Sequence, residues 1–358
     1  MSQEKPLVSI IVYNYNYGEF LEQCLESAVN QTYGNVEILF TDNASEDDSW
    51  RIALDFSGRY PDLFSISKHR RNRGSSANFR HWHSQLSGQY HIGLCADDVL
   101  HPKCIELSVK ALEANKDCAF LIFARSLIQG DLTETFEPPF LNCDCIMEPP
   151  GLSLLYMMTG FNATNSQVIY RTPKSPHNLV VPLYEEGQFR SFFRTRMQDF
   201  LISMDSPAIY LQQPLVKHRV HDRNHARFAE LNMIDVMGQY SLNFEFLEQI
   251  AGQRPEWRSI FEEQLQRATK KHAMTALRYS GRFVLSEEIR LAKQYLSLSC
   301  ALDPDCKLSE QYGAVTSAID SFGTSQFENE KASLKLINNL IQRDQSYEPP
   351  SPWRPLNS

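Results

Sequence analysis

The chain of 358 residues lacks several features that would place it in a common class of protein. It has no stretch of about 18 apolar residues, so no membrane-spanning helix is predicted, and no signal peptide is visible. Its eight cysteines form no paired Cys-x-x-Cys zinc pattern. A net charge of −8 disfavours a nucleic-acid-binding protein. Together these absences favour a protein of the reducing cytoplasm that binds no nucleic acid.

Glycine-rich phosphate-binding loops are also absent, since no segment matches Gly-x-Gly-x-x-Gly or a Walker loop. What is present is a repeated pattern of strand, polar tip and helix. Val8–Val12 is a short β-branched run typical of a buried strand, and residues 36–40, 63–66 and 90–94 have the same character. The apolar spacing from Glu19 to Asn30 predicts a helix. This alternation predicts an α/β fold with a parallel sheet whose polar loops share one edge.

The most informative residues are Asp97 and Asp98, which follow the strand predicted at 90–94. In an open α/β sheet the carboxyl ends of the strands are where ligands bind. Adjacent carboxylates at such an edge suit a divalent cation that faces phosphates. The alternative is a solvated turn that caps the helix predicted from about Pro102.

Five short segments occur in an order and at spacings that resemble one family. They are Tyr15-Asn16, Glu26-Ser27 with Gln31-Thr-Tyr33, Asp42-Asn-Ala-Ser-Glu-Asp47, Asn72-Arg-Gly74 with Asn78, and Cys95-Ala-Asp-Asp98. Together they resemble the nucleotide-sugar-binding half of the family 2 glycosyltransferases. That resemblance implies a GT-A fold, a Rossmann-like, mostly parallel sheet flanked by helices. It implies a GT-A domain over residues 1–225, with a donor half at 1–115 and an acceptor half at 116–225.

The resemblance assigns the donor contacts. Asp42 would recognise the nucleobase, and an arginine of the 70–73 loop would lie near the base or the phosphates, unless that loop is a solvated surface run. Tyr13 or Tyr15 would offer an aromatic face to a pyrimidine, which favours a UDP- or dTDP-sugar; packing alone is the alternative. The full expected set is Tyr13, Tyr15, Asn16, Asp42, Arg73, Asn78, Asp97 and Asp98.

The resemblance also implies a divalent metal, Mn²⁺ or Mg²⁺, held by Asp97. The family commonly has Asp at the position of Cys95; a thiol is a poor ligand for Mg²⁺, although softer metals tolerate it. His221 is the candidate for a second metal or diphosphate contact because it follows a Pro-Leu-Val strand in a family-like Arg-x-His-x-x-Asn run. His218 and His225 lie too close to it in the sequence to be ranked apart.

The acceptor half is expected to hold the catalytic base. Where the family has Glu-Asp at the start of a helix, this chain has Gln198-Asp199, so Asp199 is the candidate. The alternative is a helix N-terminal carboxylate stabilised by the helix dipole. The implied reaction is a single displacement with inversion, in which Asp199 takes a proton from an acceptor hydroxyl. The implied acceptor is a saccharide, a lipid-linked molecule or a protein, in polysaccharide or glycoconjugate biosynthesis.

Residues 226–345 lie outside the resemblance and have helical periodicity, while 346–358 are expected to form an extended tail. A helical extension of this kind would suit peripheral contact with the inner face of the membrane or a homo-oligomer interface. Two alternatives remain for the whole chain. One is a catalytically weak or inactive nucleotide-sugar-binding protein, indicated by Cys95 and Gln198. The other is a sugar nucleotidyltransferase, for which the required glycine-rich basic loop after the first strand is missing.

Overall fold

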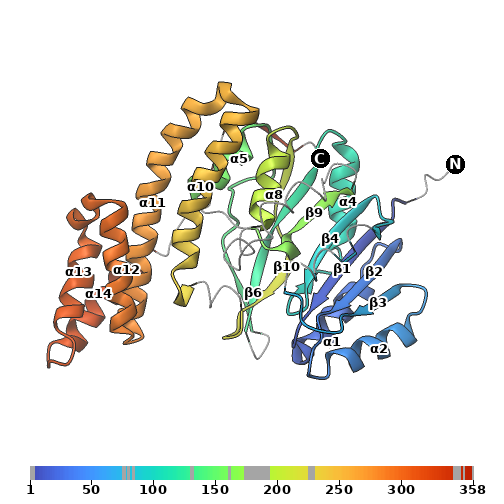
Figure 1. Cartoon of the computed structure of the whole chain (residues 1–358), viewed down its shortest axis with the longest axis horizontal. Helices are drawn as coiled ribbons and strands as arrows, with labels where there is room; N and C mark the ends of the chain where they lie inside the picture. Colours follow the sequence, from blue (N-terminus) through green and yellow to red (C-terminus); the bar gives the residue numbers. More distant parts are fainter. Residues whose placement is uncertain are drawn as a thin grey trace. The chain divides into compact units, whose positions relative to one another are not determined.

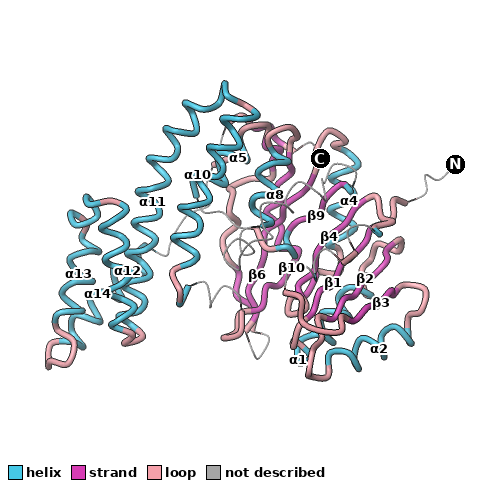
Figure 2. Tube along the Cα trace, in the orientation of Figure 1, coloured by secondary structure: helices cyan, strands magenta, loops and turns pink. Residues whose placement is uncertain are grey.

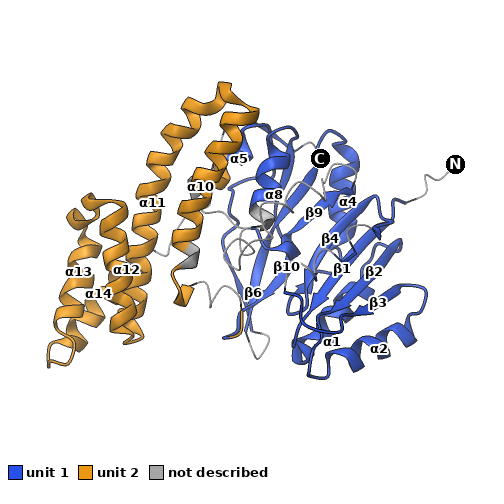
Figure 3. Ribbon diagram, viewed as in Figure 1, with its two compact units in different colours: residues 1–153, 162–222, 346–358 blue, residues 154–161, 223–345 orange. Residues whose placement is uncertain are grey.

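The structure, a computed structural model, describes residues 5–74, 78, 81–82, 85–129, 133–159, 163–172, 194–224, 230–341, 348–349 and 351–356. By its internal contacts the chain divides into two compact units, coloured separately in Figure 3. The sheet unit comprises residues 1–153, 162–222 and 346–358. The helical unit comprises residues 154–161 and 223–345.

The sheet unit is built on one sheet in the described residues, in the order β11-β8-β10-β6-β9-β4-β1-β2-β3, with β5 beside β10 and β7 beside β6. Figures 1 and 2 show the labelled strands side by side. The strands are β1 (Val8–Asn14), β2 (Val36–Asp42), β3 (Phe64–Lys68), β4 (Tyr90–Cys95), β5 (Val99–Leu100), β6 (Phe120–Ile128), β7 (Glu134–Phe136), β8 (Cys145–Met147), β9 (Val168–Arg171), β10 (Ala208–Arg219) and β11 (Trp353–Pro355).

The long strands share one direction. β1 is parallel to β2 and β4, β2 is parallel to β3, and β10 is parallel to β6. β9 is antiparallel to both β4 and β6, so β6 and β10 run the same way as β1. The α/β fold with a mostly parallel sheet and flanking helices is therefore confirmed. The carboxyl ends of β1, β2, β3 and β4 lie at one edge, as predicted.

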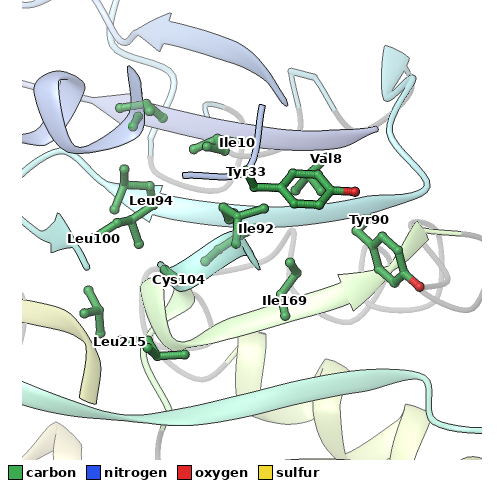
Figure 4. Packing of buried hydrophobic residues seen from close by; sticks show 14 of the residues in the cluster. Val8, Ile10, Tyr33, Tyr90, Ile92, Leu94, Leu100, Cys104, Ile169 and Leu215 are labelled. Atoms are coloured by element: carbon green, nitrogen blue, oxygen red, sulfur yellow. The ribbon is translucent and has the colours of Figure 1, made fainter. Parts of the chain in front are cut away.

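Helices pack on the sheet through an apolar face, which forms because their apolar residues recur every three or four positions. In α1 the buried side chains are Leu21, Cys24, Leu25 and Ala28, a spacing of three and four residues that faces one side. They pack with alternate residues of β1 and β4 in the core shown in Figure 4. The helices of this unit are α1 (Gly18–Val29), α2 (Ser49–Arg59), α4 (Cys104–Ala114), α8 (Arg194–Ser203) and the start of α5 (Gly151–Thr159).

β10 is longer than the apolar run Ala208–Leu211 predicts, because the strand continues through Pro214. Proline has no N–H to donate to a ladder, and the register with β6 shifts on both sides of it. After this irregularity the strand runs on to Arg219. The extra length carries β10 to the sheet edge where β4 ends.

The helical unit contains α10 (Ile234–Gln253), α11 (Arg258–Leu285), α12 (Ile289–Leu302), α13 (Glu310–Asp320) and α14 (Phe327–Ile341). The helical periodicity predicted for 226–345 is divided among these helices. Gly323, between α13 and α14, has a left-handed conformation (φ +80°) that favours glycine. No helix in the part of the chain that the structure describes is long and apolar enough to cross a membrane.

Candidate nucleotide-sugar and metal site

The site at the end of β4 depends on the two-residue strand β5, whose pairing with β10 brings residues of β10 to the end of β4. Asp97 and Asp98 follow β4 directly, and β5 then pairs antiparallel with the end of β10, with Leu100 opposite Val216 and Val99 opposite Lys217. This register brings the residues that end and follow β10 against the two aspartates. His218, Arg219 and His221 therefore contact Asp97 and Asp98, which lie more than a hundred positions earlier in the sequence.

Asp98 is completely buried, and both of its carboxylate oxygens have protein partners. Oδ1 lies 3.0 Å from Nδ1 of His218 and accepts a hydrogen bond from the backbone N–H of Arg219 at 3.1 Å. Oδ2 accepts a hydrogen bond from the Ser166 hydroxyl at 2.6 Å. Burial by itself would raise the pKa of Asp98, but His218 and these hydrogen bonds lower it below its usual value. Asp98 thus stays ionised and joins β4, β10 and the turn before β9.

Asp97 is 5 % exposed and lies beside His221, with Asp97 Oδ2 and His221 Nε2 3.1 Å apart. The His221 ring is held edge-on to Tyr17, at 5.5 Å between ring centroids, and against Phe20 at 4.8 Å. Arg219 donates from Nε to the Asp97 carbonyl at 2.9 Å, and its guanidinium lies 4.7 Å from the Phe20 ring. α1 and β10 together therefore fix the orientation of both Asp97 and His221.

The donor atoms at this edge fit a divalent cation. Ligand atoms of Cys95, Asp97 and Asp98 lie within 4.8 Å of one another, and His221 adds a ring nitrogen beside Asp97. Burial, and then the charges of Asp98 and Asp97, raise the pKa of the Cys95 thiol, which lies 3.6 Å from the Tyr13 hydroxyl. A protonated thiol is a weak metal ligand. Both carboxylate oxygens of Asp98 have protein donors, so Asp97 and His221 are the candidate ligands for a divalent cation.

Asp42, at the end of β2, is fully buried. Its Oδ1 accepts hydrogen bonds from the Asn14 amide at 2.9 Å and from the Ser45 hydroxyl at 2.5 Å. Its Oδ2 accepts from the Ser45 N–H at 2.9 Å and lies 3.5 Å from Lys68 Nζ. These contacts tie the ends of β1, β2 and β3 together, so in this conformation the carboxylate orders the edge and is not exposed to a ligand.

Asn43 organises the loop that contains Arg73. Its amide accepts from the Arg73 N–H at 2.9 Å and donates to Asn72 Oδ1 at 2.9 Å. Arg73 itself is exposed, at the same edge. Gly74 adopts a left-handed conformation (φ +80°) and donates its N–H to Asn72 at 2.8 Å, which turns the loop. The arginine is thus carried on a well-defined turn.

The remaining expected donor residues divide into exposed and structural ones. Tyr15 is 41 % exposed just past β1, where its ring is available for stacking. Asn16 has a left-handed backbone (φ +56°), and its side chain accepts from the Glu46 N–H at 2.9 Å. Asn78 is buried and donates to the Asn14 carbonyl at 3.2 Å. Both asparagines therefore connect backbone segments of the site in this structure.

Asp199, the expected base, lies in α8. It is completely buried, and its Oδ1 accepts a hydrogen bond from the Tyr170 hydroxyl at 2.5 Å. Tyr170 is paired with His91 and stacks on its ring at 5.2 Å. This contact of Asp199 thus lies on the β9 side of the sheet, and its role as a base stays a prediction.

Several residues that build the site gave no motif signal on their own. Ser166 bonds both Asp98 and the Cys95 N–H, the latter at 3.0 Å, yet it lies 68 positions from Asp98. Asn14 and Asn43 are strand-end amides whose partners become visible only in the fold. His218 is close to His221 in sequence, but in the structure it contacts Asp98, whereas His221 contacts Asp97. His225, the third histidine of the group, lies outside the described residues.

Comparison with known proteins confirms the resemblance. Residues 9–174 match the family model of glycosyl transferase family 2, a span that contains Asp42, Asp97 and Asp98 and ends before Asp199 and His221. Chondroitin synthase of Escherichia coli is 36% identical over 103 residues, which is 28% of this chain and 15% of that protein. An uncharacterized glycosyltransferase of Rickettsia prowazekii (strain Madrid E) is 32% identical over 114 residues, 31% of this chain and 34% of that protein. The chain spans less than half the length of the curated relatives it matches.

Two solved structures share the fold. TarS of S. aureus, in complex with UDP-GlcNAc, superposes with a TM-score of 0.55 at 14% identity, covering 88% of this chain and 91% of that one. The mannosyltransferase PcManGT of Pyrobaculum calidifontis, in complex with GDP-Man and Mn²⁺, superposes with a TM-score of 0.52 at 12% identity. The match covers 95% of this chain and 87% of that one. At these identities the likeness concerns the fold alone.

Proposed function

We propose that this chain, whose residues 9–174 match the family model of glycosyl transferase family 2, moves a sugar from a nucleoside-diphosphate donor to an acceptor hydroxyl. The observation that carries the proposal is the pairing of Asp97 with His221 at the carboxyl edge of the sheet, 3.1 Å apart and fixed by Arg219, Phe20 and Tyr17. The likeness in fold to TarS, solved with UDP-GlcNAc, and to PcManGT, solved with GDP-Man and Mn²⁺, supports a nucleotide-sugar donor.

The residues of the edge have separate tasks in this proposal. Asp97 and His221 hold a divalent ion, which when bound neutralises negative charge on the diphosphate as a Lewis acid. Asp98, tied to Ser166, His218 and the Arg219 backbone, keeps Asp97 in position. Exposed Tyr15 stacks on the nucleobase, and exposed Arg73 contacts the base or the phosphates.

The proposed donor is a UDP- or dTDP-sugar, and the proposed reaction is a single displacement that inverts the anomeric carbon. Asp199 is the proposed base on the strength of the resemblance. Because its carboxylate is buried against Tyr170, its surroundings have to open before an acceptor hydroxyl can reach it. The proposed acceptor is a saccharide, a lipid-linked molecule or a protein of a glycan-building process.

Calorimetric titration tests the donor site. UDP, dTDP and GDP are titrated into the full chain with and without Mn²⁺, and into Asp97→Ala. We expect one nucleotide to bind in a Mn²⁺-dependent manner, with at least about a tenfold loss of affinity in Asp97→Ala, equivalent to about 1.4 kcal/mol. Asp62→Ala, which removes an exposed carboxylate between α2 and β3, is the control for the change in net charge and should bind like the unaltered chain.

The other outcomes separate the alternatives. Binding without metal dependence and without turnover of the donor would identify a catalytically inactive nucleotide-sugar-binding protein, in keeping with the Cys95 thiol at a position that is commonly acidic. Failure to bind any of the three nucleotides, with or without metal, would rule out the transferase proposal.

A further inference from the structure

Two cysteines of the helical unit are in contact. Cys300 lies in the last turn of α12, and Cys306 lies in the short 3-10 helix η5 (Pro304–Leu308) that follows it. Their Sγ atoms are 3.7 Å apart. All eight cysteines of the chain are free thiols in this structure. The pair belongs to a different compact unit from the sheet-edge site, so its chemistry is separate from the proposed transfer reaction.

The backbone holds both thiols at this separation. The Asp303 N–H donates to the Ser299 carbonyl at 3.0 Å, which ends α12, and the Cys306 N–H donates to the Asp303 carbonyl at 3.1 Å. The Cys306 carbonyl in turn accepts from the Ser309 hydroxyl at 2.6 Å, and Ser309 caps α13. A disulfide requires an Sγ–Sγ distance of about 2.05 Å, so side-chain rotation has to close a gap of less than about 2 Å.

The two thiols differ in access. Cys306 is 3 % exposed, whereas Cys300 is partly exposed at the surface of the unit. Burial raises the pKa of the Cys306 thiol, so Cys306 is the less reactive of the two toward an external reagent. A reagent from solution therefore meets Cys300 first, with Cys306 behind it at contact distance.

We propose that Cys300 and Cys306 form a redox-active dithiol that is oxidised by small-molecule disulfides such as glutathione disulfide. The Cys300 thiolate attacks one sulfur of the reagent, which forms a mixed disulfide and releases one thiol. Cys306 then attacks the Cys300 sulfur and releases the second thiol. The cysteine pair loses two electrons and two protons, and the reagent gains them as two thiols. The product ties the end of α12 to η5.

The test exposes the full chain to glutathione buffers of graded oxidised-to-reduced ratio, then blocks free thiols and maps the peptides by mass spectrometry. We expect a disulfide between Cys300 and Cys306, seen as the loss of the mass of two hydrogen atoms from the peptide that contains both cysteines. Cys306→Ala should accumulate one glutathione on Cys300, and Cys300→Ser should prevent both products. Cys143→Ser, which removes another partly exposed thiol, should leave the Cys300–Cys306 link unchanged.

The proposal is overturned if the native chain forms no Cys300–Cys306 link at any ratio, or forms it only after unfolding in urea. It is also overturned if the link joins Cys143 and Cys145 while Cys300 and Cys306 stay reduced. Because the decisive measurement is made on the unaltered chain, it does not depend on the folding of the buried Cys306 variant, which circular dichroism checks separately.

Discussion

Asp97 and Asp199, the carboxylates expected to hold the metal and to act as base, occupy different surroundings. Asp97 lies beside His221 at the sheet edge, whereas Asp199 is buried in α8 with the Tyr170 hydroxyl on its Oδ1. A buried carboxylate with a short charge-assisted hydrogen bond is well suited to holding structure together. It acts as a base only if the acceptor hydroxyl can replace that bond.

Two variants separate these roles of Asp199. If it is the base, Asp199→Asn should lower kcat by at least about 100-fold, because general base catalysis is lost. Tyr170→Phe removes a partner of the same carboxylate; it should cost about 1.5–3 kcal/mol of stability while the folded protein keeps kcat within a few-fold. The measurements are release of nucleoside diphosphate from the donor identified by calorimetry, and thermal unfolding of both variants.

The structural role would give a different pattern for the same pair. Asp199→Asn and Tyr170→Phe would then lower the unfolding midpoint by similar amounts. Activity would fall only in proportion to the folded fraction. That result would remove Asp199 from the proposed mechanism and leave the binding site at Asp97 and His221 untouched.

The sequence predicted that Asp97 follows a strand, because a carboxylate after a short apolar run is a local signal, and the family resemblance singled out His221, which the structure places beside Asp97. It could not predict that His218 and Ser166 hold Asp98, since those contacts depend on the pairing of β5 with β10 and on the turn before β9. Nor could it predict that Asp42 is closed in by Asn14, Ser45 and Lys68. These contacts join residues from separate strand ends.

At the scale of elements, local patterns gave the first half of the fold and long-range pairing gave the rest. β1 and β2 are short apolar runs, and α1 has a complete period-3.6 pattern, each within its own residues. β8 and β11 have three residues each, too few for any periodicity, and they pair with each other across some two hundred positions. The segment 129–151, whose sequence with Pro138-Pro139 and Pro149-Pro150 is typical of an irregular loop, nevertheless contributes β7 and β8 to the sheet.

Gly88 shows how closely two elements of the sheet approach each other. It lies just before β4, and its N–H donates to the Ser9 hydroxyl of β1 at 3.0 Å. A Cβ at this position would lie 2.5 Å from Ser9 Oγ, 2.6 Å from Ser9 N and 2.6 Å from the Tyr90 carbonyl oxygen. Two of these atoms belong to the backbone and cannot turn away, so a methyl group would push β4 from β1.

Gly88→Ala is therefore expected to destabilise the chain by about 2 kcal/mol or more through overpacking. Gly58→Ala is the matched control, because its Cβ would meet nothing within 4 Å near the end of α2. This substitution should be neutral or stabilising by up to about 1 kcal/mol, since alanine favours helix. Urea unfolding of both variants measures the difference. If both substitutions changed the free energy of unfolding equally, the close approach of β1 to Gly88 would be contradicted.

At the scale of the whole molecule, the chain leaves the sheet unit after residue 222 and returns to it for residues 346–358. On its return, β11 pairs antiparallel with β8, with Trp353 opposite Met147. Arg354 donates to Glu148 and Asp117, both at 2.6 Å, and Leu356 packs against the core cluster of the sheet unit. The C-terminal residues are thus part of the sheet, although they follow the helical unit in sequence.

Removing residues 351–358 is expected to destabilise the sheet unit by about 2 kcal/mol, mainly through lost burial of Leu356 and of the β8 edge. The ion pairs of Arg354 are partly exposed, so Arg354→Ala alone should cost less than about 1 kcal/mol. Hydrogen exchange locates the effect: amides of β8 should lose protection in the truncated chain, while those of α11 in the helical unit keep theirs. A uniform loss of protection in β8 and α11 would contradict a local role of the tail. Unchanged exchange in β8 would mean that β11 does not stabilise the sheet.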